Sequence, residues 1–337
     1  MAAVTQKVTK SQLSGMLGGI GAMPLVVASF FLFFAILEPN FVSVDNLFNL
    51  TRQSSYLILV CMAQFVILLT GGIDLSVGST VSLVSVVCAT TMKFMAAAYP
   101  DSITLAVFAS VLIGIGAGAL VGLANGIGVA IFNVTPFVMT LGTLSMALGL
   151  ALFISGGYSI AGLPSAFGDV FSYNSLAGIP VPIVYAALVA ILLYFLLNWT
   201  RVGRYIYAIG SNLQAARLSG IRTRLYLVVA YAISGVIVGF SAVLMTARTE
   251  SGEASLGGAD LVLRAVAGCI IGGVALTGGK GILRNVILGA FFITLLSNGM
   301  NLLRVNSYLQ TFIMGAVLVL AIAIDQMRER YVGRKTV

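Results

Sequence analysis

The 337-residue chain contains no histidine, and only 8% of its residues are charged. An ordinary soluble domain is about 25% charged. No nucleophile–base pair, carboxylate pair or metal-ligand cluster is evident, and no acidic residue falls in the middle of a long apolar run. Carriers driven by protons or sodium commonly need an ionisable group or an unwound ion site inside the membrane. These absences argue against a membrane enzyme and against an ion-coupled carrier.

Cysteine is also scarce. Cys61, Cys88 and Cys269 are isolated within apolar runs, and no metal or redox spacing links them. An odd number of cysteines cannot pair completely. We expect all three to be buried small apolar side chains.

Apolar residues, by contrast, make up 59% of the chain, and its mean hydropathy is +1.08. The 38 glycines exceed the average share of about 7%, which suits close helix packing in lipid. The apolar runs are around 20 residues long and do not alternate, unlike the strands of an outer-membrane barrel. The composition therefore predicts a polytopic α-helical membrane protein.

The apolar runs predict about ten transmembrane helices. Asn125-Gly126 and Thr135-Pro136 are expected to bracket a turn, and residues 156–179 to form an irregular loop. The first run is favoured as a retained helix over a secretory signal, because no clear cleavage site follows it. The predicted spans are approximately Ile20–Leu37, Leu47–Leu69, Leu75–Ala98, Ile103–Ala124, Pro136–Ser155, Val181–Trp199, Leu225–Ala247, Leu261–Thr277, Ile282–Leu303 and Tyr308–Ile324.

The charges separate between the two sides of this topology, and an even number of spans places both termini on one side. The net charge of +8 is interpreted as the positive-inside bias and not as nucleic-acid binding. We therefore expect a cytoplasmic segment 1–17, a single transmembrane domain 18–325 with a cytoplasmic loop 200–224, and a basic cytoplasmic tail 326–337. Basic residues lie on the inner side at Lys7, Lys10, the arginines of 201–224, Lys280, Arg284, Arg328, Arg330, Arg334 and Lys335; acidic residues lie on the outer side at Glu38, Asp45, Asp101, Asp169, Glu250, Glu253 and Asp260.

The segment Arg201–Arg224 holds five arginines and no acidic residue. Ser211 and Gln214 have the spacing of a capping box, and Gly220 stands where a helix C-cap glycine would. These signals predict a short helix from about Asn212 to Ser219. A helix of two turns is marginal alone in water, so it needs a docking surface.

Three glycine-rich stretches lie elsewhere in the chain. Gly114, Gly118, Gly122 and Gly126 recur every four residues, which predicts close packing of one helix on another. Residues 71–78 form a break in which Asp74 suits a helix N-cap; a break of this kind is also tolerated where it lines a cavity. Residues 272–281 resemble a phosphate loop but lack its spacing, so the chain has no nucleotide-binding motif of its own.

Five stretches together resemble the permease subunit of bacterial monosaccharide ABC importers, the family that takes up ribose, arabinose, xylose, galactose and related sugars. They are GGIDLSVGS (71–79), GALVGLANG (118–126), TPFVMTLGT (135–143), GRYIYAIGSNLQAARLSGI (203–221) and GGVALTGGKG (272–281). The resemblance extends from about residue 20 to 325. It departs from the family at Val262 and Arg264, where an acidic pair is common.

The resemblance implies an inner-membrane subunit without a cofactor of its own, usually dimeric. Its partners would be a cytoplasmic ATPase, which binds ATP and magnesium, and a periplasmic sugar-binding protein, with membrane lipid around it. The segment matching 203–221 would contact the ATPase, with docking centred on the small face of the short helix around Leu213. The expected coupling residues are Gly203, Arg204, Gly210, Ser211, Asn212, Leu213, Ala215, Ala216 and Gly220.

A sugar needs hydrogen-bonding groups along its path through the membrane. The candidates are Asp74, Ser76, Asn125, Thr140, Thr143, Asn298 and Asn301, each of which has a helix–helix hydrogen bond as its alternative role. Tyr158 and Tyr173 in the outer loop are candidate contacts for the sugar or for the binding protein. The remaining functional alternatives are an ABC permease for a nucleoside or another polar solute, and an ATP-independent facilitator.

Overall fold

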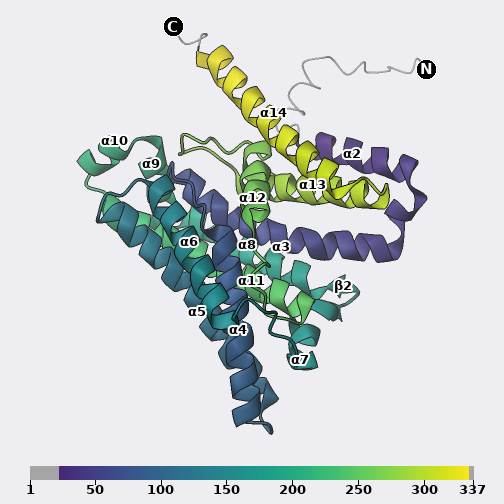
Figure 1. The fold of residues 1–337 in the computed structure, drawn as a ribbon. Helices are drawn as coiled ribbons and strands as arrows, with labels where there is room; N and C mark the ends of the chain where they lie inside the picture. Colours follow the sequence, from purple (N-terminus) through teal and green to yellow (C-terminus); the bar gives the residue numbers. More distant parts are fainter. Residues whose placement is uncertain (1–22, 334–337) are drawn as a thin grey trace, which may run out of the picture.

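The structure is a computed structural model that describes residues 23–333, with side chains described to Ala323. The predicted N-terminal segment and part of the basic tail lie outside the described residues. The described chain is helical apart from one short hairpin (Figure 1). Its elements are α2 (Met23–Leu37), η1 (Pro39–Val42), α3 (Val44–Leu69), α4 (Val77–Ala98), α5 (Ile103–Ala130), α6 (Pro136–Ser155), α7 (Ser165–Gly168), η2 (Asp169–Tyr173), β1 (Ser175–Leu176), β2 (Ile179–Pro180), α8 (Val181–Trp199), α9 (Arg201–Ser211), α10 (Leu213–Leu218), α11 (Thr223–Thr249), α12 (Ala259–Ile271), α13 (Leu283–Leu302) and α14 (Ser307–Gly333).

The helices confirm a polytopic membrane protein. Seven of the described helices, α3, α4, α5, α6, α8, α11 and α13, are long and apolar enough to cross a membrane. Each of the other three predicted spans also contains a helix. Helix α2 and the apolar part of α14, Ser307–Ala323, are shorter, and α12 has only 13 residues, about 20 Å of helix.

Two predicted boundaries were wrong. Helix α5 continues to Ala130, so Asn125 and Gly126 lie inside it and not at a turn. Both residues are buried: the Asn125 side chain is hydrogen-bonded within the bundle, and Gly126 packs against Val228 of α11. The eighth span ends at Ile271 and not near Thr277, because Gly273 takes a positive φ of 77° that L-residues with side chains disfavour.

The predicted irregular loop 156–179 contains α7, η2 and most of the β1–β2 hairpin.

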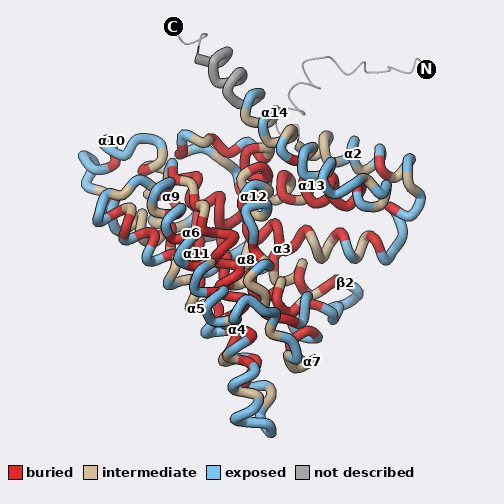
Figure 2. The backbone as a smooth tube through the Cα atoms, in the orientation of Figure 1, coloured by how far each residue is buried: buried red, intermediate tan, exposed pale blue. Residues whose placement is uncertain are grey.

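Helices α3 and α11 form the centre of the bundle. Most of α3 is buried, and α11 packs against α3, α4 and α5 (Figure 2). The glycine stripe of α5 lies against α11, where a Cβ on Gly118 would meet the Gly235 carbonyl oxygen at 2.6 Å. Such an approach is possible only between residues without side chains. The predicted close packing is confirmed, with Gly235 and Gly239 as its partners on α11.

A non-helical segment, residues 250–258, follows α11 and runs back along α4. The Ser82 hydroxyl donates to the Gly257 carbonyl (2.9 Å) and accepts from the Gly257 amide (3.1 Å). The Ser85 hydroxyl accepts from the Glu253 amide at 3.1 Å. Backbone outside a helix is tolerated at membrane depth only where protein satisfies it or water reaches it. The serines of α4 thus position the start of α12 inside the bundle.

The three cysteines are buried and free, as predicted. Cys61 and Cys269 lie at the contact of α3 with α12, where the Cys269 thiol donates to the Cys61 carbonyl at 3.2 Å. Both act as small side chains that also satisfy a backbone group.

Candidate functional site

The first glycine break, between α3 and α4, is held by a buried polar network. The Asp74 carboxylate accepts from the Ser76 amide (2.8 Å) and hydroxyl (2.6 Å). Asn125 of α5 donates to the Ser76 hydroxyl at 2.9 Å and accepts from the Thr143 hydroxyl of α6 at 2.6 Å. The N-cap residue of α4 is Ser76 and not Asp74. Asp74 lies two residues earlier, and its side chain forms a turn by accepting from the Ser76 amide.

Two further side chains fasten the backbone of the same break. The Thr140 hydroxyl of α6 lies 3.3 Å from the Ile73 carbonyl oxygen. With its amide oriented to satisfy both groups, Gln64 of α3 donates to the Asp74 carbonyl (3.1 Å) and accepts from the Asp74 amide (3.3 Å). The break is therefore held from α3, α5 and α6 at once.

The structure brings five of the seven candidate path residues into this one network, and it buries all five. Their polar groups satisfy one another, as helix–helix hydrogen bonds do. Asn298 lies elsewhere, in a reciprocal amide pair with Asn46 at 2.8 and 3.0 Å. Asn301 is exposed near the end of α13, where it accepts from Gln310 at 2.9 Å.

The second glycine break, residues 272–282, meets the first one beside α9. The Gly279 amide donates to the Leu69 carbonyl of α3 at 2.9 Å. A Cβ on Gly210 of α9 would lie 2.6 Å from the Gly279 nitrogen and closer still to the Leu69 carbonyl oxygen. The Tyr207 hydroxyl of α9 donates to the Gly281 carbonyl at 3.0 Å. We call this meeting of Leu69, Gly210 and Gly279 the glycine junction.

The electrostatics of α9 suit this contact. Burial raises the pKa of the Tyr207 hydroxyl, so it is neutral at physiological pH and remains a hydrogen-bond donor. Thr200 caps the helix by accepting from the Gly203 amide, and Gly203 itself packs against Leu197. Two coupling residues of the prediction, Gly203 and Gly210, thus lie at packing contacts and not on the open surface, whereas Arg204 is exposed.

The predicted short helix exists as α10. Its cap is Asn212, whose side chain accepts from the Ala215 amide at 2.9 Å; the predicted capping box at Ser211 is wrong, because Ser211 ends α9. Gly220 has a φ of 79°, and the amides of Gly220 and Ile221 donate to the carbonyls of Arg217 and Ala216, a Schellman motif. The predicted glycine cap is confirmed.

Helix α10 stands at one edge of the molecule (Figure 1). Ala216 is buried, while Ser211, Asn212, Leu213, Ala215 and Gly220 are exposed. Leu218 is 91% exposed, an apolar side chain that the sequence prediction did not single out. Its signal was present: an apolar residue follows Arg217 at the end of a helix whose buried face is filled by Ala216. Beneath α10 lies a cavity of about 240 Å³, lined in part by Leu213, Arg217 and Thr70.

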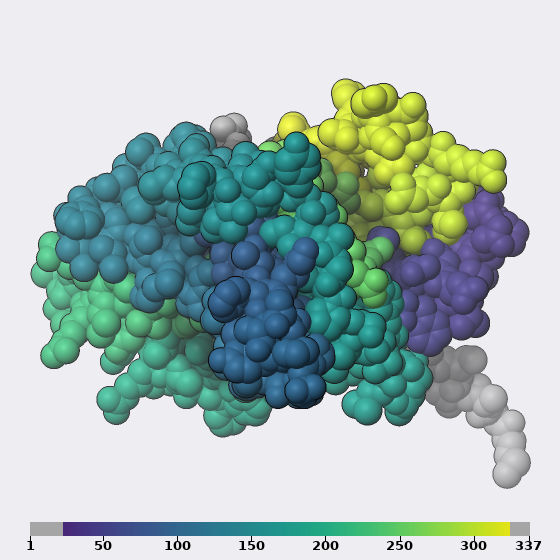
Figure 3. Space-filling view, turned by 60° about the horizontal axis from the view of Figure 1, so that its bottom comes forward, coloured from purple at the N-terminus to yellow at the C-terminus, as the bar shows by residue number. Residues whose placement is uncertain are grey.

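The opposite face of the bundle carries α7, the hairpin and the far end of α4, which projects toward the viewer in Figure 3. Tyr158 is 80% exposed there. Tyr173 is anchored instead, because its hydroxyl donates to the Arg248 carbonyl at 2.7 Å. The two tyrosines therefore differ in their freedom to meet another molecule.

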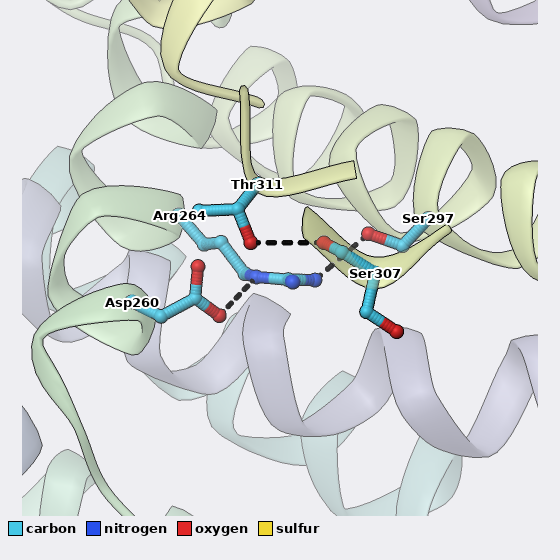
Figure 4. A network of polar contacts seen from close by, with 5 residues as sticks. All are labelled: Asp260, Arg264, Ser297, Ser307 and Thr311. Carbon is cyan, nitrogen blue, oxygen red and sulfur yellow. Dashed lines mark hydrogen bonds and ion pairs between the residues drawn. The ribbon is translucent and has the colours of Figure 1, made fainter. Parts of the chain in front are cut away.

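At the two positions that depart from the family pattern, the side chains point different ways. Val262 is buried and lies next to Gly78. Arg264 forms an ion pair with Asp260 at 2.7 Å, and its guanidinium donates to the Ser297 hydroxyl of α13 at 2.7 Å (Figure 4). Thr311 of α14 lies beside this pair, and its hydroxyl donates to the Ser307 carbonyl of its own helix at 3.1 Å. Arg264 thus joins α12 to α13 through a charged, hydrogen-bonded group, with α14 beside it.

Comparison with known proteins places these features in a family. A family model described as the permease component of branched-chain amino acid transport systems matches residues 46–322. The chain is 38% identical to the D-allose transport system permease protein of Escherichia coli over 87% of both chains. It is 35% identical to the galactose/methyl galactoside import permease of that species, over 92% of this chain and 94% of the relative. Identity to its ribose import permease is 31%, over 87% and 89%. No solved structure matches.

Proposed function

The chain belongs to the family of permease components of carbohydrate-uptake ABC transporters, and we propose that it carries a monosaccharide across the bacterial inner membrane. It is a transport subunit and not a catalytic one. Its relatives are named for allose, galactose and ribose, so a neutral pentose or hexose is the substrate class. ATP hydrolysis belongs to a separate subunit, which binds the nucleotide and magnesium; the permease needs no cofactor.

We propose a single permease domain, residues 18–325, that crosses the membrane with about ten helices. The basic α9–α10 segment and both termini, including the tail 326–337, lie in the cytoplasm, where arginines are favoured over the outer surface. The face with α7 and the hairpin then lies outside. Its partner is a periplasmic sugar-binding protein, with Tyr158 among its candidate contacts. A second copy of the permease, with lipid around both, completes the assembly.

Helix α10 is the proposed ATPase contact. It offers Leu213, Ala215, Leu218 and Gly220 on its open side, and it has little support from the rest of the bundle. A helix this short gains stability from a docked partner. Arginines around it, such as Arg217 and Arg222, suit lipid head groups or acidic side chains. Arg204, Ser211 and Asn212 border the same surface, whereas Gly203 and Gly210 transmit its movement.

The observation that carries the coupling proposal is the glycine junction. There α9 abuts the end of α3 and the second break at once, through Gly210 and through the Tyr207–Gly281 hydrogen bond. A force applied to α10 passes along α9 to the breaks that begin α4 and α13. The network of Asp74, Ser76, Asn125, Thr140 and Thr143 then lies where the first break must move, so we assign it to the transport path as a gate. Asn298 is proposed to brace the path and Asn301 to line it.

The test compares two substitutions at Gly220. An arginine there forces a bulky L-residue into a left-handed conformation, at a cost of about 1–2 kcal/mol, and covers the α10 surface. Asparagine tolerates the same conformation and is the matched control. We expect Gly220→Arg to lose ATPase copurification and sugar-dependent uptake, and Gly220→Asn to keep both. Retained copurification and transport-coupled hydrolysis in Gly220→Arg would refute the coupling role.

A second candidate substrate rests on the family model, which is described by branched-chain amino acid transport. That description adds an amino acid such as leucine to the other alternative cargo, a nucleoside or another small polar solute. Purifying the chain with its native partners and screening the binding protein against pentoses, hexoses, nucleosides and leucine separates these possibilities. Saturable binding of a pentose or hexose alone supports the proposal, and binding of another class alone contradicts it.

A further inference from the structure

The Asp260–Arg264 pair is the one ion pair among the described side chains, and it is not enclosed. The Asp260 side chain is 57% exposed and that of Arg264 30%. Both belong to α12, which begins inside the bundle after the non-helical segment 250–258. An open ion pair is ordinary on a soluble surface but not on a membrane protein's flank.

The depth of the pair follows from the helices beside it. Arg264 donates to Ser297, five residues before the outer end of α13 at Leu302, or about 8 Å along the helix. Thr311 stands four residues into α14, about 6 Å from the outer start of that helix. The charges therefore lie inside the outer boundary of the bundle and not in a connecting loop.

Contact with lipid hydrocarbon is unfavourable for this exposed ion pair. Charged side chains within transmembrane segments are costly in hydrocarbon, and they almost always face the bundle interior or a water-filled cavity. A cavity of about 60 Å³ lies against the pair, with room for a few water molecules. Thr311 adds a hydroxyl to its wall, and the remaining lining is apolar, including Leu263, Ile293 and Met314. Together, the open charges and a cavity beside them that is large enough for water indicate an aqueous lining.

Further polar groups extend this lining along α13 and α14. Asn301 follows Ser297 by four residues and so lies on the same side of α13, and its exposed amide is held by Gln310 of α14. Three helices thus turn donors and acceptors to one surface. We call Asp260, Arg264, Ser297, Asn301, Gln310 and Thr311 the α12–α14 polar surface.

We propose that the α12–α14 polar surface lines the outer half of the sugar path and hydrogen-bonds the hydroxyl groups of the entering sugar. This inference rests on the proposed function. Carboxylate oxygens accept from hydroxyls, whereas guanidinium and amide nitrogens donate to them, so the surface offers both kinds of partner. Asp260 and Arg264 neutralise each other, which suits an uncharged sugar.

The first experiment tests whether the surface is aqueous. Leu263, beside Arg264, is 53% exposed, and Leu188, about 10 Å from the outer start of α8, is 54% exposed. The native cysteines are buried, so Leu263→Cys and Leu188→Cys can be compared in the full complex in membranes, using a membrane-impermeant maleimide from outside. We expect at least tenfold faster labelling of Leu263→Cys, slowed by the transported sugar with its binding protein. Equal labelling rates, or no slowing by sugar, would overturn the inference.

The second experiment tests contact with the sugar in the reconstituted complex, using radiolabelled D-allose, D-galactose and D-ribose. Arg264→Gln and Asp260→Asn should lower the uptake rate about tenfold to a hundredfold, the range for losing a hydrogen bond to a charged group. Arg264→Lys should lower the uptake rate less. Lys93→Gln removes the charge of an exposed residue on α4 and should leave the uptake rate at the wild-type value. Wild-type uptake by Arg264→Gln in equally assembled complexes would overturn the inference. Failure of the wild-type complex to import any pentose or hexose would instead refute the proposed function.

Discussion

Replacing Gly210 by alanine perturbs the proposed coupling at one atom. The added Cβ would stand 2.6 Å from the Gly279 nitrogen and 2.9 Å from the Leu69 carbonyl carbon, whereas ordinary contacts lie at 3.4–4 Å. All of these neighbours are backbone, so no side chain can swing aside. Either α9 or the second break must therefore shift by about 1 Å to restore ordinary contact distances, and this shift strains the hydrogen bond between Gly279 and Leu69.

The magnitude follows from the hydrogen bond that this movement breaks. The Gly279 amide donates to the Leu69 carbonyl at 2.9 Å. Leaving a buried amide unsatisfied costs about 1–3 kcal/mol. A coupling free energy of that size corresponds to a change of about 5- to 150-fold between two linked events. We expect Gly210→Ala to lower the amount of sugar imported per ATP hydrolysed by about 5- to 150-fold.

The assay measures uptake and hydrolysis together in proteoliposomes that contain the full complex. Gly149→Ala is the matched control, because a Cβ at Gly149 on α6 meets nothing within 4 Å. Tyr207→Phe removes only the hydrogen bond to Gly281, so it should shift coupling in the same direction by a smaller amount. If assembled Gly210→Ala and Tyr207→Phe complexes import as much sugar per ATP as wild type, the glycine junction does not transmit force.

Two other predictions concern packing. Gly122→Val should lower the midpoint of thermal unfolding, because its Cβ would stand 3.0 Å from the Gly235 Cα. A Cβ at Gly116 meets nothing within 4 Å, so Gly116→Val should unfold at nearly the same temperature as wild type. Equal midpoints for the two variants would contradict close α5–α11 packing. Asn298→Leu should lower the free energy of unfolding by about 1–3 kcal/mol, because Asn46 loses its partner. In a double-mutant cycle, the Asn46→Leu/Asn298→Leu double variant should recover part of this loss. Strict additivity in that cycle would contradict a direct amide pair.

The sequence predicted best what depends on local chemistry. Each predicted apolar run contains a helix, because a span in lipid must satisfy its own backbone. Gly220 ends α10 as predicted, because a left-handed C-cap residue follows from the local pattern alone. The cap shifted from Ser211 to Asn212 because both residues can cap and only the fold decides between them.

Long-range packing decided the rest. Asn125-Gly126 has the composition of a turn, yet Ser76 and Thr143 satisfy the asparagine and α11 closes on the glycine, so the helix continues. The path of residues 250–258 depends on Ser82 and Ser85, far away in the sequence. The candidate path residues formed a closed network for the same reason. A polar residue in a helix shows that it needs a partner but not which partner.

We propose that sugar import through this chain is driven by a separate ATPase. The most direct measurement is uptake of radiolabelled D-allose, D-galactose and D-ribose by proteoliposomes that contain the permease, its copurified ATPase and its loaded binding protein, with and without ATP. We expect saturable uptake of at least one of these sugars, and we expect it to require both ATP and the ATPase. Equal uptake by vesicles that contain the permease alone would identify a facilitator and refute ATP-driven import.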